Sequence, residues 1–187
     1  MKIVRRIMSM LMALALIMCL QVPVKAADDG PKLSMTVSET EVSVGDTVKL
    51  TINADEDFLT RGSGFTVYYD DTVLELDTAD STAVAPFTVN GPVQVKGKSA
   101  FRVSFMPGME EAQVSASEPL AVVSFKALAV SEAASFEMGA AYLYDTALGE
   151  IPTTAADKVS VTVKPSVTYI PVTGVTLDKT ELTLEEV

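Results

Sequence analysis

Apolar and polar residues alternate along most of the chain after residue 31, which is the pattern of β-strands that bury one face. The alternation is clearest between Gly64 and Asp77. It is interrupted there by the acidic pair Asp70-Asp71 and resumes at Leu74. We therefore predict a strand, a tight acidic corner and a second strand in this stretch.

Further strands are predicted where the same alternation, or a short apolar run, is bounded by turn residues. The candidate segments are residues 33–37, 42–44, 48–54, 87–89, 93–95, 101–105, 120–128, 135–144 and 159–163, of which 93–95 could form a short strand and 135–144 has an unsure register. The run at 120–128 is apolar on both sides, which is typical of a strand in the middle of a sheet. Residues 81–86 are predicted to form a loop, and Gly91-Pro92 to separate two strands.

This spacing predicts an all-β fold, an antiparallel β-sandwich of about nine strands between Lys32 and Lys164. The best helical candidate is Ala127 to Phe136, where Ser131-Glu132 favours a loop instead. The side chains expected to fill the core are Val48, Leu50, Phe65, Val67, Leu74, Leu76, Phe101, Val103, Phe105, Val123, Phe125 and Val161.

Residues 1–26 have the composition of a secretory signal peptide. The apolar run from Ile7 to Leu20 has 14 residues, fewer than the ~20 that span a bilayer, which disfavours a retained anchor. Cys19 resembles the lipidated residue of a bacterial lipoprotein, but Met18 before it is larger than the usual residue. We expect cleavage after Ala26, no membrane insertion after cleavage, and a secreted protein that could be attached to the cell surface through a C-terminal region.

The net charge and the residue types of the chain narrow the range of partners and reactions that it could have. Four of the 14 basic residues lie within residues 1–26, so the cleaved chain would carry a net charge of −15, which disfavours nucleic acid and anionic membranes as partners. The absence of histidine, and of any cysteine besides Cys19, excludes histidine bases, cysteine nucleophiles and Cys/His zinc sites. The acidic residues lie in turns and lack EF-hand spacing, which favours solvated carboxylates over calcium ligands. We predict no catalytic residues, no metal and no cofactor.

Four segments, GDTVKLTINA, GFTVYYDDTVLEL, AFRVSF and LAVVSFKALA, stand in the order and at about the separations found in cohesin domains. The chain resembles that family over residues 33–164, and we take 32–164 as the module. The resemblance implies a nine-stranded jelly-roll β-sandwich that binds a dockerin on one exposed sheet face. It also implies a relationship by fold to carbohydrate-binding modules.

The resemblance places an outward row of side chains on each of two strands. These are Gly62, Gly64, Thr66 and Tyr68 on the first strand and Ala100, Arg102, Ser104 and Met106 on the second. Dockerin-binding cohesins have hydrogen-bonding side chains where Gly62 and Gly64 stand here. We predict Thr66, Tyr68, Arg102, Ser104 and Met106 as the partner-binding residues.

After a predicted linker at 165–171, the segment VTGVTLDKTELTL resembles the opening strand of a bacterial Ig-like domain of the second group, so residues 172–187 are predicted to be the truncated start of one. The function predicted for the chain is a non-catalytic, monomeric module that binds a dockerin-type protein. The alternatives are a carbohydrate-binding module, disfavoured because there is no Trp and Tyr69 should be buried, and a structural spacer or adhesin module.

Overall fold

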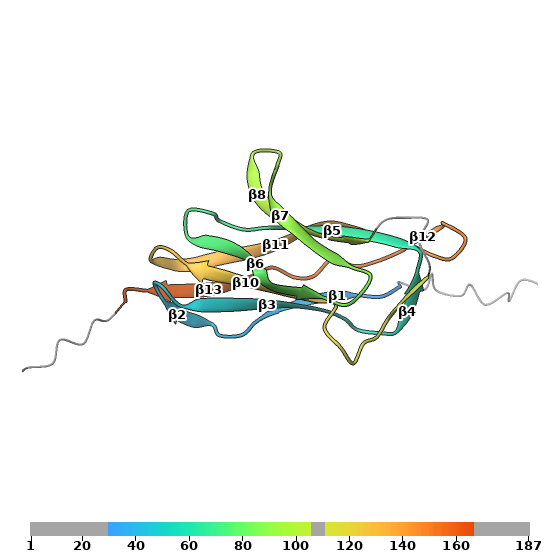
Figure 1. The fold of residues 1–187 in the computed structure, drawn as a ribbon, viewed down its shortest axis with the longest axis horizontal. Coiled ribbons are helices and arrows are strands. Elements are labelled where there is room, and N and C mark those ends of the chain that lie inside the picture. The colour runs from blue at the N-terminus through green and yellow to red at the C-terminus, as the bar shows by residue number, and fades with distance from the viewer. Residues whose placement is uncertain (1–29, 106–110, 167–187) are drawn as a thin grey trace, which may run out of the picture.

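A computed structural model describes residues 30–105 and 111–166. Two sheets lie face to face in it, as Figure 1 shows. The first sheet contains, in spatial order, β1 (Leu33–Val37), β3 (Thr47–Ala54), β10 (Ala121–Ala127) and β6 (Leu74–Ala83). The second contains β2 (Glu41–Ser43), β13 (Val159–Lys164), β11 (Ser131–Tyr144), β5 (Gly62–Tyr68), β8 (Lys98–Phe105) and β7 (Thr88–Val95), with β12 (Glu150–Ile151) paired to β11.

A separate two-stranded sheet joins β4 (Phe58–Thr60) to β9 (Ala112–Val114). Every pairing between the named strands is antiparallel except that of β13 with β2, which is parallel. The predicted all-β sandwich is confirmed: the described residues form nine strands of five or more residues and four shorter ones. No helix in this part of the chain is long and apolar enough to cross a bilayer.

The predicted acidic corner is present between β5 and β6. Its carboxylate at Asp70 accepts hydrogen bonds from the amide and the hydroxyl of Thr72, and the Asp70 carbonyl accepts one from the amide of Leu74 at 2.9 Å. These bonds close a turn in which the aspartate satisfies the backbone locally. The corner returns the chain from the second sheet to the first.

Phe125 lies at the centre of the core and joins the two sheets. Its ring, on β10 of the first sheet, lies 5.0 Å from that of Phe136 and 5.8 Å from that of Phe101, which belong to the second sheet. Tyr69, directly after β5, packs edge-on against the Phe125 ring at 5.1 Å. Of the predicted core residues, only Leu76 is partly exposed, and the rest are buried.

Two predictions about chain breaks were wrong. Residues 81–83 belong to β6, and Gly91-Pro92 lies inside β7. At both places the strand is irregular: the register shifts between Val122 and Ser124 opposite β6, and between Asn90 and Val93 within β7. A side chain at Gly91 would meet Leu76 at 2.9 Å, so this glycine permits a close approach within a strand.

The predicted signal peptide, Met106 and the predicted Ig-like start lie outside the described residues, as does most of the predicted linker. The prediction of residues 127–136 as a loop was wrong for its second half, because β11 begins at Ser131. In this stretch β11 pairs with β13, with Phe136 opposite Val159 and Ala134 opposite Val161, and this pairing extends the strand.

We expect truncation of Phe125 to alanine to lower the free energy of unfolding by about 3–5 kcal/mol, because it removes a fully buried ring and leaves a cavity between the sheets. Chemical denaturation measures this change. Lys126→Ala, at the next and exposed position of β10, should change it by less than about 0.5 kcal/mol. A loss under about 1 kcal/mol for Phe125→Ala would contradict the central place of this ring.

Two buried hydroxyl groups provide a second, paired prediction. The Thr60 hydroxyl lies 2.9 Å from the carbonyl oxygen of Tyr144 and 3.0 Å from that of Gly62, whereas the Ser63 hydroxyl has no partner among the described residues. Thr60→Val should therefore destabilise the fold by about 1–3 kcal/mol, and Ser63→Ala should leave its stability unchanged or raise it. Equal losses in both variants, measured by thermal unfolding, would contradict this assignment.

Candidate functional site

The outer face of the second sheet carries four of the five side chains predicted to bind a partner. Thr66 on β5 lies directly opposite Arg102 on β8, and Gly64 lies opposite Ser104. Tyr68 stands two residues further along β5 on the same face. Their strand neighbours Phe65, Val67, Phe101 and Val103 point into the core. The four side chains are therefore brought together on one surface, and Met106 lies outside the described residues.

Two positions predicted to point outward are buried instead, namely Gly62 and Ala100. Ala100 lies between its cross-strand neighbours Tyr68 and Val93. Its single methyl group is too short to reach the surface between those larger side chains. At this end of β5 and β8, the exposed part of the outer face therefore begins with Tyr68 and does not include Ala100.

Tyr142 and Glu137 are members of this face that the sequence did not reveal. Tyr142 on β11 pairs with Gly64 and is 51% exposed, and Glu137 pairs with Tyr68. Strict alternation from the buried Met138 would have pointed Tyr142 inward. A register shift between Met138 and Ala141 reverses the alternation, so Leu143 is buried and Tyr142 faces outward.

A shallow hollow of about 310 Å³ lies in the middle of this face. We call it the Gly64 hollow; its lining residues are Gly64, Phe65, Thr66, Arg102, Ser104 and Tyr142. It spans three neighbouring strands, β11, β5 and β8. The only charged residue in its lining is Arg102, although the chain as a whole is strongly acidic.

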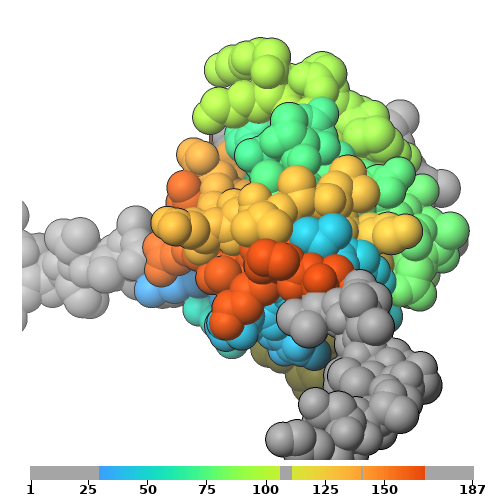
Figure 2. Space-filling model, turned by 90° about the vertical axis from the view of Figure 1, so that its left-hand side faces the viewer, coloured from blue at the N-terminus to red at the C-terminus, as the bar shows by residue number. Residues whose placement is uncertain are grey.

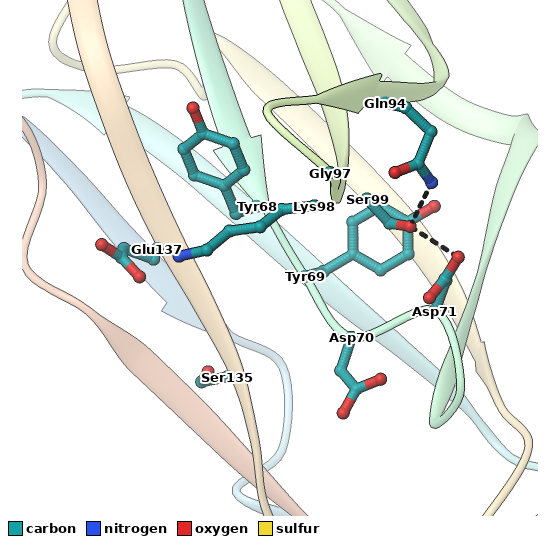
Figure 3. Close-up of a pocket in the computed structure, with 10 residues that line it drawn as sticks. All are labelled: Tyr68, Tyr69, Asp70, Asp71, Gln94, Gly97, Lys98, Ser99, Ser135 and Glu137. Atoms are coloured by element: carbon teal, nitrogen blue, oxygen red, sulfur yellow. Dashed lines mark hydrogen bonds between the residues drawn. The ribbon is translucent and has the colours of Figure 1, made fainter.

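A larger cleft of about 520 Å³ lies at the end of the sandwich, beside the acidic corner. In the end-on view of Figure 2, the tip of the β7–β8 hairpin lies above this corner. Figure 3 shows the line of hydrogen bonds in its wall: the Gln94 amide donates to the Ser99 hydroxyl at 2.7 Å, and Ser99 donates to the Asp71 carboxylate. Lys98 stands 5.6 Å from the centre of the Tyr68 ring, a cation–π contact at the mouth of the cleft.

Most of the side chains that line the cleft are polar, and they are better suited to hydrogen bonding with a ligand than to catalysing a reaction. Burial raises the pKa of the Tyr69 hydroxyl above its usual value, and the negative charge of Asp71 raises it further. Tyr69 therefore stays protonated at neutral pH. Within the described residues there is no group of three or more His, Cys, Asp or Glu side chains that could hold a metal ion.

Comparison with known proteins identifies the family model that matches this chain as the cohesin domain, over residues 33–163. No curated protein matches the sequence. Among solved structures, the cohesin module of a family 33 glycoside hydrolase from Clostridium perfringens superposes with a TM-score of 0.56 at 14% identity, covering 73% of this chain and 98% of that module.

Two further solved structures have the same fold. A type I cohesin–dockerin complex from Clostridium thermocellum matches with a TM-score of 0.56 at 13% identity, covering 76% of this chain and 99% of the other. A type II cohesin domain from the cellulosome of Acetivibrio cellulolyticus matches with a TM-score of 0.52 at 19% identity, covering 71% and 95%. At these identities the likeness establishes the fold alone.

The environment of Tyr69 leads to a testable titration. Because its folded pKa is raised, the stability that it contributes is complete below the unfolded value of about 10 and is lost as the pH rises through the folded pKa. Titration of the tyrosinate absorbance should show a late component that Tyr69→Phe removes. Asp71→Asn should shift this component to lower pH, whereas Tyr68→Phe should leave it in place. A late component that persists in Tyr69→Phe would contradict the assignment.

Proposed function

This chain belongs to the cohesin domain family, and from that premise we propose that it docks a dockerin-type protein on the outer face of its second sheet. The coarser part of this statement, a cohesin-fold binding module, follows from the family match over residues 33–163. The proposal adds the partner and the face. Thr66, Tyr68, Arg102, Ser104 and Met106 remain our proposed contact residues.

The observation that carries the proposal is the position of Tyr68 and Arg102 on one sheet face with no core role. Arg102 is exposed, Tyr68 is partly exposed, and both lie on strands whose opposite face is fully buried. Tyrosine and arginine are enriched among the residues that dominate protein–protein binding energy. A sheet held rigid by its core presents them in a fixed arrangement, which lowers the entropy cost of docking.

We further propose that residues 32–164 are the complete functional unit and act outside the cell as part of a larger assembly. The strands from Leu33 to Lys164 close both sheets, and the family match has nearly the same limits. An extracellular setting is supported by the predicted signal peptide.

Carbohydrate binding is the second candidate, because one observation favours it. The register shift in β11 turns Tyr142 outward on the same face as Tyr68, which gives this surface two tyrosine rings on adjacent strands. Sugar-binding surfaces use such rings for stacking. The positive charge of Arg102 on the same face favours a protein partner, because arginine is enriched at protein–protein interfaces.

We expect the double variant Tyr68→Ala/Arg102→Ala to bind a dockerin at least about 30-fold more weakly, the effect of losing about 2 kcal/mol at an interface hot spot. Calorimetry with individually purified dockerin modules from the same genome measures this change. Thermal unfolding should be unaltered, because neither side chain is in the core.

The matched control is Thr36→Ala/Lys126→Ala, which removes two exposed side chains from the first sheet. It should bind as the unmodified protein does. Equal affinity of the two double variants would exclude the outer face of the second sheet. Binding of soluble polysaccharide by the unmodified protein, lost in Tyr68→Ala/Arg102→Ala, with no dockerin bound, would favour the carbohydrate alternative.

A further inference from the structure

The Gly64 hollow exists because one residue in the middle of β5 has no side chain. Gly64 is flanked on its outer face by Tyr142 of β11 on one side and Ser104 of β8 on the other. All three belong to the lining of the hollow. A side chain at position 64 would point outward, between these two neighbours, and would fill the space.

The fold itself does not require a glycine at this position. The backbone of Gly64 is not in the left-handed region, and a Cβ atom placed there would meet its nearest neighbour, the Ser104 Cβ, at 3.5 Å, an ordinary contact. Gly91 and Gly139 differ, because a Cβ atom at either would come within 3.0 Å of a neighbour. Glycine in a strand interior is less stable than residues with side chains. The open space therefore has no structural reason within the described part of the chain.

The walls of the hollow define what would fill it. Tyr142 is half exposed on β11, and Arg102 is exposed on β8, so an aromatic face and a cation stand on either side of β5. Arg102 forms no ion pair with another described residue; the pairs found there involve Lys49, Arg61 and Lys164. Aromatic rings pack favourably against other aromatic rings and beneath a guanidinium group.

The hollow is also large enough to hold an aromatic side chain. Its volume of about 310 Å³ exceeds the roughly 150 Å³ of a cavity that takes up benzene. An aliphatic side chain would use the Tyr142 wall but would gain nothing from Arg102. A carboxylate would pair with Arg102 but would leave the space over Gly64 unfilled.

We propose that the Gly64 hollow receives one aromatic side chain from the docking partner, packed between Tyr142 and Arg102. This inference rests on the proposed function, because it names the feature of a dockerin-type partner that this face selects. It makes Gly64, Tyr142 and Arg102 the residues that determine specificity.

The test fills the hollow with a side chain that suits a strand. Gly64→Ile places a β-branched group in it, and Thr36→Ile places the same group on an exposed position of the first sheet as the control. We expect Gly64→Ile to weaken binding of a purified dockerin at least tenfold, and Thr36→Ile to change it less than twofold. Thermal unfolding of both variants establishes that they are folded.

An alanine scan of the bound dockerin then identifies the occupant. One aromatic residue of the dockerin should lose affinity on truncation in the unmodified protein and lose little in Gly64→Ile, the non-additivity of two groups in contact. Unchanged dockerin binding by Gly64→Ile overturns the inference while the proposed function stands. Coupling to an aliphatic or charged dockerin residue also overturns it.

A second measurement separates this inference from the proposed function. In nuclear magnetic resonance, the probe N-acetylphenylalaninamide should shift the amide signals of residues 64 and 142 in the unmodified protein and not in Gly64→Ile. N-acetylleucinamide should shift them less. If no dockerin binds, the proposed function fails. If, in addition, the probe causes no such shifts, the inference that the hollow binds an aromatic group fails as well.

Discussion

The packing of aromatic rings between the two sheets is the constraint on which the rest of the structure depends. Phe125 crosses from the first sheet to contact Phe101 and Phe136 of the second, so neither sheet buries its inner face without the other. Because strand residues alternate between faces, burying Phe101 commits Arg102 to the outer surface. The buried core residues, which no partner contacts, therefore fix the geometry of the proposed binding face.

Sequence patterning predicted the sandwich because most strands obey strict alternation around large apolar residues. The stretch around Asp70 is an example: its flanking strands, its corner and the burial of Tyr69 could all be read from residue types. The resemblance to cohesins placed Thr66, Tyr68, Arg102 and Ser104 in outward rows on two strands, and they share one face because β5 and β8 pair without interruption. Their role in binding remains a prediction.

The failures occurred where a strand departs from regular pairing. The dipeptide Gly91-Pro92 is typical of a chain break, yet β7 continues through it. The glycine here allows the close approach of the Leu76 side chain and does not form a turn. Tyr142 was missed because the register shift after Met138 reverses the alternation. A bulge of this kind depends on the tertiary pairing of β11 with β5, and neither residue spacing nor propensity records it. The hollow depends on the same event, since only the shifted register brings Tyr142 opposite Gly64.

A sandwich organised in this way separates the requirements of folding from those of recognition. Gly64 and Arg102 face away from the core, so their replacement alters the surface without disturbing the ring packing beneath. This accounts physically for how structures with 13–14% identity to this chain share its fold: the inner face needs only apolar residues at alternate positions. The outer face is free of that demand. Function in such a family therefore resides in the few outward residues of a shared scaffold, and it has to be argued from those residues in each chain.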